Sequence, residues 1–517
     1  MTFEIAIVLV ALVGMIVALI LDRMRPGMVL LTVVVLFFCC GIISTKEMLE
    51  GFSNKGMITV AMLFLISEGV RQTGALSSLI RRLLPQNKTT VFRAQMRMLP
   101  SIALISAFLN NTPVVVIFAP IVKHWAEKVN LPPTKFLIPV SYVTILGGMC
   151  TLMGTSTNLV VDGMIIDAGF EGLSMFELGK VGIVIAITGI LYLFLFSGKL
   201  LPETRTDLSG LEEEKEIQSD KLIVEAILGA RFPGINKKLG DFDFERHYGA
   251  KVREIKRSGQ SLVKNLEKER LREGDTLVLV TDESFIKSWG ESSGFVMLTN
   301  NVDAETKVEK WKRWFALSLM VMMIAGVVIG DLPAVKTLVP GLKLDMFFFV
   351  SVTTIIMAWT KLFPPKKYTK YISWDVLITI ACAFAISKAM INSGVADTIA
   401  GFILKECSSY GPQLLLAAIF IITNVFTELI TNNAAAALIF PLALSLAEQM
   451  GVDPMPFFVT ICMAASASFS TPIGYQTNLI VQGIGNYKFT DYTRIGLPLN
   501  IITFLLSVFL IPLIWPF

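Results

Sequence analysis

The sequence carries little charge and almost no histidine. Charged residues make up 17% of its 517 residues and hydrophobic residues 54%, with a mean hydropathy of +0.66. A soluble protein of this size needs a larger charged surface, so the composition favours an integral membrane protein. The two histidines, and six scattered cysteines without a C-x-x-C pair, count against a catalytic zinc centre.

Other absences narrow the class further. The sequence contains no P-loop, nucleophile elbow or metal-ligand cluster, so we expect no enzyme and no cofactor. It lacks the TVGYG run of a potassium-channel filter, which counts against a channel. The first apolar run follows no basic segment and precedes no A-x-A cleavage site, so we expect a retained span.

Long apolar runs are abundant. A membrane span needs about 20 mainly apolar residues. Two apolar stretches, about 98–122 and about 412–446, are interrupted by the tripeptides Asn110-Asn111-Thr112 and Thr431-Asn432-Asn433, and we predict a re-entrant hairpin at each. Ten further runs are long enough to span: 3–21, 27–44, 57–80, 134–165, 178–199, 313–330, 344–360, 373–400, 456–485 and 494–515.

Residues 201–312 differ from the rest of the chain. They hold nearly half of its charged residues in about a fifth of its length. A polar linker, about 209–220, opens the segment, and a helical stretch is expected near 261–272. Strand-like runs are expected at 222–228, 250–256, 276–280 and 295–298. We predict a small α+β domain outside the bilayer.

The membrane portions on either side of this insert repeat one another. Residues 151–164 align with 471–484 at an offset of 320, and seven of the fourteen positions are identical. At an offset of 321, Asn111 falls on Asn432. Each half then holds five spans and one hairpin, which makes an odd number of crossings. We therefore predict an α-helical polytopic membrane protein built from two inverted repeats.

The predicted repeat 1 covers 1–200, with a discontinuous helix at about 134–165. Repeat 2 covers 313–517, with a discontinuous helix at about 456–485. With both termini outside, sixteen lysines and arginines fall in short inside loops and six in outside loops. This asymmetry favours that orientation and places the insert in the cytoplasm. We expect a multi-pass protein of the plasma or inner membrane, with no nucleic-acid partner.

The interruptions are the candidate site. Broken helices survive in a bilayer where protein or water covers the freed backbone groups, and transporters use such breaks to bind ions. Besides the two tripeptides, Gly154–Asn158 and Gly474–Asn478 share a Gly-x-x-Thr-Asn pattern. Asn, Thr and Ser offer neutral oxygens for a hard cation and donors for an oxyanion. Polar contacts between helices are the alternative explanation.

Charges within the apolar runs need partners. Glu68 and Lys388 occupy equivalent positions in the two repeats, which suggests a structural ion pair or snorkelling ends. Glu428, beside Thr427 in the second hairpin, has no such explanation. Because Glu68 and Glu428 can carry protons, proton coupling stays open beside sodium coupling.

At these motifs the sequence resembles the divalent anion–sodium symporter family of the ion transporter superfamily, which is marked by paired Ser-Asn-Thr motifs in two hairpins. The stretches Leu109–Val116 and Gly147–Val161 look most like its sulfate-transporting branch. The resemblance implies sodium-coupled symport of a small divalent anion, most simply sulfate, by an elevator-type homodimer. A gated anion channel is the less favoured alternative.

The resemblance implies roles for particular residues. Asn110 and Asn433 stand where the family has Ser and Thr, and Tyr475-Gln476 is bulkier than usual, which leaves sulfate, thiosulfate and dicarboxylates open. The implied sodium ligands are Ser106, Asn110, Asn111 and Gly154 in one site and Thr427, Ile430 (backbone), Asn432 and Gly474 in the other. The implied anion contacts are Asn111, Thr112, Thr155, Asn432, Asn433 and Tyr475. Supporting positions are Ser156, Thr157, Asn158, Gln476, Thr477 and Asn478.

The insert resembles a single TrkA-C (RCK C-terminal) domain. The stretches that carry this likeness are Ile227–Gly234, Val252–Arg257 and Leu271–Val280, with Arg272-Glu273-Gly274-Asp275 as the clearest. The resemblance implies a regulatory role and a small cytoplasmic ligand; a passive folding or dimerisation module is the alternative.

Overall fold

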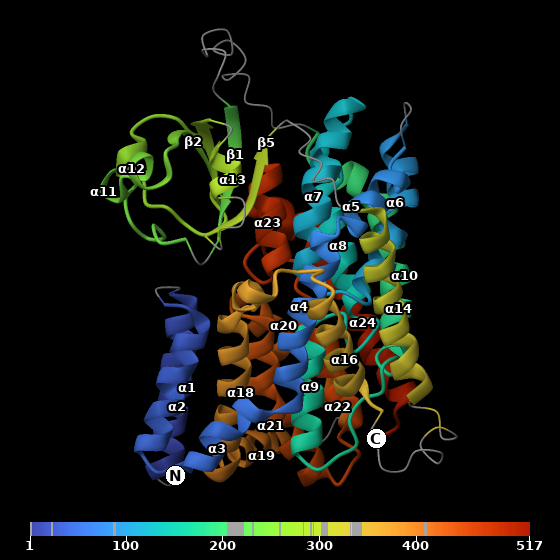
Figure 1. The fold of residues 1–517 in the computed structure, drawn as a ribbon. Coiled ribbons are helices and arrows are strands. Elements are labelled where there is room, and N and C mark those ends of the chain that lie inside the picture. The colour runs from blue at the N-terminus through green and yellow to red at the C-terminus, as the bar shows by residue number, and fades with distance from the viewer. Residues whose placement is uncertain are drawn as a thin grey trace.

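A computed structural model of the chain describes residues 3–21, 24–85, 89–203, 222–229, 232–257, 260–282, 284–289, 292, 294–300, 309–330, 332, 335, 344–407 and 411–517. The polar linker expected at about 209–220 lies outside these residues. The described part is a mostly helical body with a small sheet domain at one end, and both chain termini lie at the opposite end (Figure 1).

Helices are the only regular elements among the described residues of the first half. Pro26 opens the second helix, where the missing N–H of proline costs nothing. The elements are α1 (Phe3–Ile20), α2 (Pro26–Cys39), α3 (Thr45–Glu50), η1 (Gly51–Ser53), α4 (Lys55–Gln72), α5 (Ala75–Leu83), α6 (Val91–Ser106), α7 (Asn111–Lys128), η2 (Pro133–Lys135), α8 (Leu137–Gly148), α9 (Ser156–Asp167) and α10 (Gly179–Leu200).

The second half follows the same order of elements. Its described helices are α14 (Lys310–Gly330), α16 (Met346–Trp359), η6 (Pro365–Lys367), α17 (Tyr368–Tyr371), α18 (Trp374–Asn392), α19 (Val395–Cys407), α20 (Gly411–Leu429), α21 (Asn432–Met450), α22 (Met455–Ser466), α23 (Gln476–Gly485) and α24 (Phe489–Ile514).

The predicted hairpins and broken helices have direct counterparts in these elements. The interrupted stretches form the helix pairs α6/α7 and α20/α21, and the runs at 134–165 and 456–485 are divided into α8/α9 and α22/α23. Figure 1 shows α6 and α7 in the upper half of the body and α20 and α21 in the lower half.

By length and composition, eight of the described helices can cross a membrane. This number differs from the ten predicted spans for three reasons. The runs at 27–44 and 344–360 form helices of only 14 residues. The two broken spans are divided, and both arms of the second hairpin reach spanning length. The spans are Phe3–Ile20, Thr45–Gln72 (α3, η1 and α4 taken together), Gly179–Leu200, Lys310–Gly330, Trp374–Asn392, Gly411–Leu429, Asn432–Met450 and Phe489–Ile514.

Packing across the halves is reciprocal. Helix α2 packs on α18 and α16 packs on α4, while α7 packs on α23 and α21 packs on α9. Within each half, α6 packs on α8 and α20 on α22. The helix α10 lies with α24, α8 and α6, whereas α14 lies with α16 and α4. The helices thus form two groups. One contains the helices on either side of the four breaks, α6, α7, α8, α9, α20, α21, α22 and α23, and the other contains α1, α2, α4, α14, α16 and α18. We refer to them as the break-bearing group and the second group.

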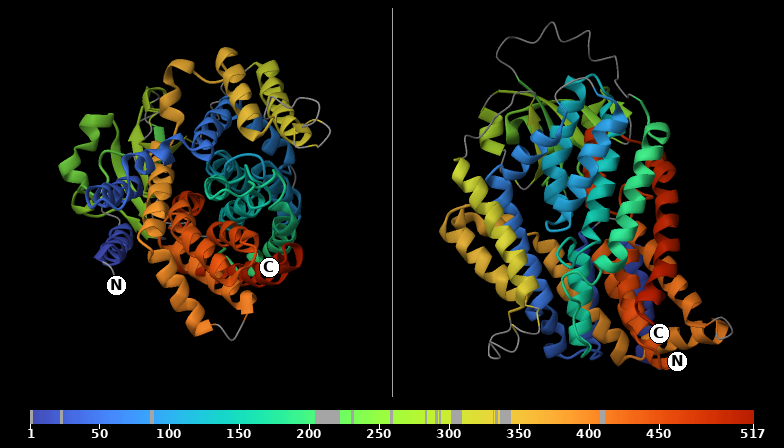
Figure 2. Two further views of the ribbon diagram at one scale, coloured as in Figure 1. Left: turned by 90° about the horizontal axis from the view of Figure 1, so that it is seen from below. Right: turned by 90° about the vertical axis from the view of Figure 1, so that its right-hand side faces the viewer.

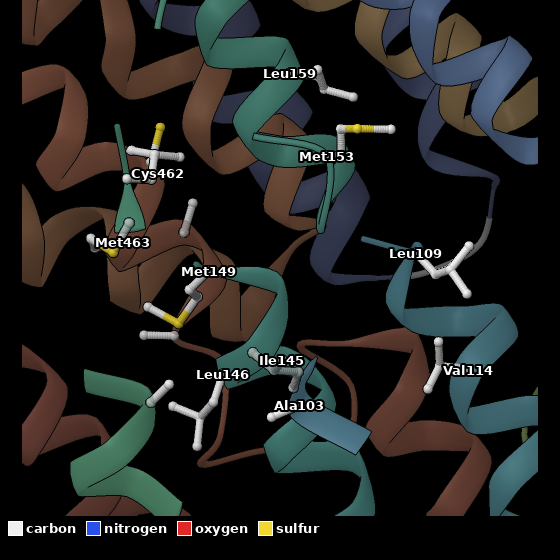
Figure 3. Packing of buried hydrophobic residues seen from close by; sticks show 14 of the residues in the cluster. Ala103, Leu109, Val114, Ile145, Leu146, Met149, Met153, Leu159, Cys462 and Met463 are labelled. Atoms are coloured by element: carbon white, nitrogen blue, oxygen red, sulfur yellow. The ribbon is translucent and has the colours of Figure 1, made fainter. Parts of the chain in front are cut away.

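The break-bearing group has a continuous apolar interior. Figure 3 shows Ala103, Ile145 and Leu146 close together where α6 meets α8, and Cys462 and Met463 on α22 nearby. All five side chains are buried. Figure 2, seen from below, shows the N-terminal helices at the edge of the body, away from this interior. Asn111, Thr155 and Asn432 at the breaks are buried beside this interior, whereas Ile473 in the last break is exposed.

The sheet domain has five antiparallel strands in the order β3-β2-β4-β1-β5. The runs predicted as strands are β1 (Leu222–Leu228), β2 (Lys251–Arg257), β4 (Thr276–Thr281) and β5 (Phe295–Asn300). An aromatic cluster around Phe232 and Phe295 fills its core. The remaining elements are β3 (Gln260–Leu262), α11 (Leu239–Phe242), α12 (Phe244–Tyr248), η5 (Leu266–Lys268) and α13 (Ser284–Trp289).

The helical stretch expected near 261–272 is wrong. The segment holds β3 and the single turn η5 instead. Asn265 has a left-handed conformation, with φ +56°, which ends any helix through this point. At the turn before β4, Arg272 N–H donates to Asp275 at 2.8 Å, and Arg257 pairs with Asp275 at 2.7 Å.

The sheet domain docks on the break-bearing group (Figure 1). Lys123 of α7 pairs with Glu225 of β1 at 2.7 Å, and Lys256 pairs with the same carboxylate at 3.0 Å. Burial opposes ionisation of Glu225, but the two ammonium groups outweigh it and lower its pKa to about 2. Nearby, Leu479 of α23 packs against the backbone of Gly274, where a Cβ would lie 2.9 Å from the leucine.

Candidate functional site

Both hairpin tips meet the break of the opposite half. From the first tip, the Asn111 amide lies 2.6 Å from the Tyr475 hydroxyl, and the Thr112 hydroxyl donates to Gln476 Oε1 at 3.2 Å. The tip of α7 and the start of α23 are therefore in direct polar contact, although they lie 364 residues apart.

The second tip makes the corresponding contacts with the first half. Asn433 Oδ1 accepts hydrogen bonds from the Thr157 hydroxyl at 3.1 Å and from the Ser156 hydroxyl at 3.4 Å. The two pairs of breaks are joined to each other, because the Thr155 and Tyr475 hydroxyls lie 3.0 Å apart. All four interruptions thus form one polar cluster.

Four helices begin at this cluster. They start at Asn111, Ser156, Asn432 and Gln476 and run for 18, 12, 19 and 10 residues. Each N-terminus has backbone N–H groups without partners inside the helix and a partial positive charge. None of the described side chains that make the cluster's contacts belongs to arginine, lysine or histidine. A negative ligand here would be held by helix ends, amides and hydroxyls.

A set of oxygens surrounds the first tip. One terminal atom of the Asn111 amide lies 2.9 Å from Ser106 Oγ, 3.0 Å from the Thr144 carbonyl oxygen and 3.2 Å from that of Gly154. If this atom is Nδ2, it donates to these oxygens. This orientation satisfies every neighbour, because Oδ1 then accepts from the Tyr475 hydroxyl at 2.6 Å.

Asn110 supports a cation site at the first tip. Its side chain is only 7% exposed, and neither Nδ2 nor Oδ1 has a hydrogen-bond partner within the described part of the chain. A buried amide without partners is costly, so such a group is expected to face a ligand. The family resemblance implies a sodium site at Asn110, Asn111 and Ser106, and the buried amide of Asn110 fits a cation ligand.

The second tip has a similar set of oxygens. Thr427 Oγ1 lies 3.0 Å from Asn432 Oδ1 and 2.7 Å from the Ala465 carbonyl oxygen. A hydroxyl has one proton, so it can satisfy only one of these acceptors. Asn432 and Thr427 occupy the positions equivalent to Asn111 and Ser106. The residues present fit a second cation as well.

The glycines of the two breaks permit the close approach. A Cβ at Gly154 would lie 2.5 Å from the Gly148 carbonyl oxygen, and a Cβ at Gly474 would overlap Ser468 Oγ. Both clashes lie within the break itself, with the end of α8 and with the segment after α22, so a side chain at either glycine would force the break open. This space requirement explains why both motifs begin with glycine.

The asparagines that end these motifs hold the breaks in shape. Asn158 Nδ2 donates to the Thr151 carbonyl at 2.9 Å, and Asn478 Nδ2 donates to the Ser468 carbonyl at 2.9 Å. Ser141 donates to Asn478 Oδ1 at 2.7 Å and lies 2.9 Å from the hydroxyl of Thr477. These two asparagines and Thr477 therefore contact the surrounding backbone and helices.

The Glu428 carboxylate accepts four hydrogen bonds that could not be predicted from the sequence. Its Oε1 accepts from Ser470 N at 2.8 Å and Asn500 Nδ2 at 2.9 Å. Its Oε2 accepts from the N–H and hydroxyl of Thr471 at 2.9 and 2.7 Å. The carboxylate thus binds the chain between α22 and α23, next to Thr427.

Some predicted pairings are not formed, and some site atoms were missed. Glu68 pairs with Arg71 at 2.6 Å, and Lys388 pairs with Asp167 at 3.1 Å, so Glu68 and Lys388 do not pair with each other. The carbonyls of Thr144 and Ala465 carry no signal in the sequence. The buried hydroxyl of Ser468 was also missed, because glycine, Gly148, stands at the position 320 residues earlier.

The family match and the named relatives identify the chain as a membrane transporter and not an enzyme. A family model described as "Citrate transporter" (CitMHS) matches residues 16–353 and 338–517. The chain belongs to this family, which agrees with the resemblance to divalent anion–sodium symporters.

Individual relatives extend along most of the chain. It is 27% identical to "Uncharacterized transporter sll0640" of Synechocystis, over 99% of this chain and 97% of the relative. It is 21% identical to "Probable sodium/sulfate cotransporter 3" of Chlamydomonas reinhardtii, over 91% and 84%. The crystal structure of the Alcanivorax borkumensis YdaH transporter has a similar fold, with a TM-score of 0.52, 12% identity and coverage of 91% and 87%.

Proposed function

We propose that this protein is a secondary active transporter that couples the entry of a small divalent anion, most simply sulfate, to sodium. The observation that carries the proposal is the convergence of four helix N-termini on one cluster of amides and hydroxyls, at Asn111, Ser156, Asn432 and Gln476. Such a site attracts a dianion without a fixed positive side chain.

Two sodium ions balance the anion in this proposal. The first is bound by Ser106, Asn110, Asn111 and Gly154. The buried amide of Asn110, which has no hydrogen-bond partner among the described residues, supports this site.

The second ion is bound by Thr427, Asn432, Gly474 and the Ile430 carbonyl. The doubly engaged hydroxyl of Thr427 supports it. Freed carbonyls and hydroxyls at helix breaks are suitable sodium ligands. The naming of a relative as a sodium/sulfate cotransporter also favours sodium.

We place the anion between the tips, against Thr112, Thr155, Asn433 and Tyr475 together with Asn111 and Asn432. Sodium coupling is favoured over proton coupling by the surroundings of Glu428, whose four contacts are all donors to its oxygens. A carboxylate that already accepts four hydrogen bonds is a poor proton carrier.

Transport in this proposal is an elevator movement of the break-bearing group past the second group. The contacts between the groups are unequal in the two halves: α21 packs along α18 more extensively than α7 packs along α4. A cavity of about 270 Å³, lined by Phe384, Lys388 and Phe440 among others, lies between α9, α18 and α21. Unequal contacts between related halves are expected of one end state of a two-state carrier.

The sheet domain is a regulatory, TrkA-C-like unit in this proposal, on the cytoplasmic side of a homodimer whose termini lie outside. It contacts α7 and α23, which both begin at the site. A small ligand of the domain would change transport if it bound one carrier state better than the other.

Uptake into proteoliposomes tests the function. We expect labelled sulfate to enter when an inward sodium gradient is applied, and entry to collapse when choline replaces sodium at constant pH. Equal rates in sodium and choline would remove sodium coupling. Failure of sulfate to enter or to compete with any labelled anion would remove the proposed substrate.

A further inference from the structure

Tyr475 is the one large side chain at the centre of the polar cluster. It is the residue directly before α23, and its backbone is extended, with φ −139° and ψ 134°. Its hydroxyl lies 2.6 Å from the Asn111 amide and 3.0 Å from Thr155 Oγ1, and the Asn432 side chain also interacts with it. The phenol therefore touches both hairpin tips and the opposite break.

The repeat shows that this position is asymmetric. Thr155 is the residue 320 positions earlier, and it likewise stands directly before its half-helix, α9. Both hydroxyls point toward one another across the cluster. One half thus contributes a small side chain and the other a full aromatic ring to the same space.

We infer that Tyr475 sets the size of the transported anion, and that its ring excludes substrates with two separated carboxylates in favour of one compact tetrahedral oxyanion. This inference rests on the proposed function and narrows its substrate class. In this inference the ring, held between Asn111 and Thr155, leaves no room beside the tips for the second carboxylate of a succinate-like molecule. The hydroxyl donates to the bound oxyanion together with Asn111 and Thr155.

The ring and the hydroxyl make separable contributions. Tyr475→Phe keeps the ring and removes the hydroxyl. Tyr475→Thr removes the ring, keeps a hydroxyl and introduces the same residue as at the equivalent position 155. Discrimination by shape within a pocket is worth roughly 10- to 200-fold. We therefore expect Tyr475→Thr to raise the competition by succinate against sulfate by roughly tenfold or more.

The experiment measures sodium-driven uptake of labelled sulfate and labelled succinate by the full-length wild type and both variants in proteoliposomes. We expect the wild type and Tyr475→Phe to carry sulfate but not succinate, with weaker sulfate binding in Tyr475→Phe. We expect Tyr475→Thr to carry succinate. The stabilisation of each protein against thermal unfolding by sulfate and by succinate is measured in parallel, so that a variant that binds an anion without transporting it still gives a result.

Two outcomes would overturn the inference while leaving the proposed function intact. One is a Tyr475→Thr protein that still carries or binds sulfate and excludes succinate as strictly as the wild type. The other is a Tyr475→Phe protein that admits succinate, since the hydroxyl and not the ring would then set the limit. A wild type that moves no sulfate in sodium would instead remove the proposed function itself.

Discussion

The substitution Glu428→Gln tests whether the Glu428 carboxylate has a structural role or carries a proton. Each carboxylate oxygen accepts two hydrogen bonds, from Ser470 and Asn500 on one side and from both donors of Thr471 on the other. A glutamine must turn its NH₂ group toward one of these pairs, so two donors lose their acceptor. Hydrogen bonds to a charged group contribute about 1.5–3 kcal/mol each, so the loss is roughly 3–6 kcal/mol.

The assay compares thermal unfolding and sulfate uptake of Glu428→Gln with those of a matched variant, Glu68→Gln. Glu68 is also a buried glutamate, but its donors Arg71 and Gln72 belong to its own helix, and Arg71 is 43% exposed, so we expect a smaller loss there and no effect on the breaks. Glu428→Gln should unfold at a clearly lower temperature than Glu68→Gln and lose most uptake.

The opposite pattern would refute the reasoning. A Glu428→Gln protein as stable as the wild type, whose uptake no longer depends on pH, would mean that this carboxylate carries a proton. The break between α22 and α23 would then not depend on its charge.

Three further predictions follow from named contacts. Asn432→Ala should leave folded protein in the membrane but abolish sodium-dependent uptake, and an uptake rate near that of the wild type would exclude this tip from the site. Lys123→Met removes the nearer of the two cations that hold the pKa of Glu225 at about 2, so the sheet domain should be cleaved faster by protease, and unchanged proteolysis would argue against docking through this pair. In the wild type, the stability that this carboxylate contributes is present above its usual pKa of about 4.5 and is lost as pH falls from there toward 2. A cysteine near Lys367 should be labelled only from the cytoplasmic side and one near Gly451 only from outside, and labelling of both from one side would contradict the inverted repeat.

The breaks could be located from the sequence because asparagine, glycine and proline interrupt otherwise apolar helices at equivalent positions. The helix pairs α6/α7 and α20/α21 therefore begin and end within a few residues of expectation at their tips. The strands of the insert were equally visible, since their apolar runs are short and bounded by turns. Local composition carries this information.

Contacts between the halves could not be predicted in the same way. The partner of Glu68 is Arg71, one turn along its own helix, and the partner of Lys388 comes from α9. Neither ion pair follows from the equivalence of positions 68 and 388 in the repeat, because the partner of each charge depends on how the helices pack against one another in this structure. The engagement of Tyr475 with Asn111 and Thr155 depends on the same arrangement.

Equilibrium binding of sulfate to the purified protein, measured by calorimetry in sodium and in choline at constant ionic strength and pH, tests the central claim most directly. If the cations and the anion share the cluster at Asn111 and Asn432, each must strengthen the binding of the other by the same factor. We predict that sulfate affinity rises steadily with sodium concentration. Sulfate binding of equal strength in choline would contradict a site assembled from sodium and four helix ends.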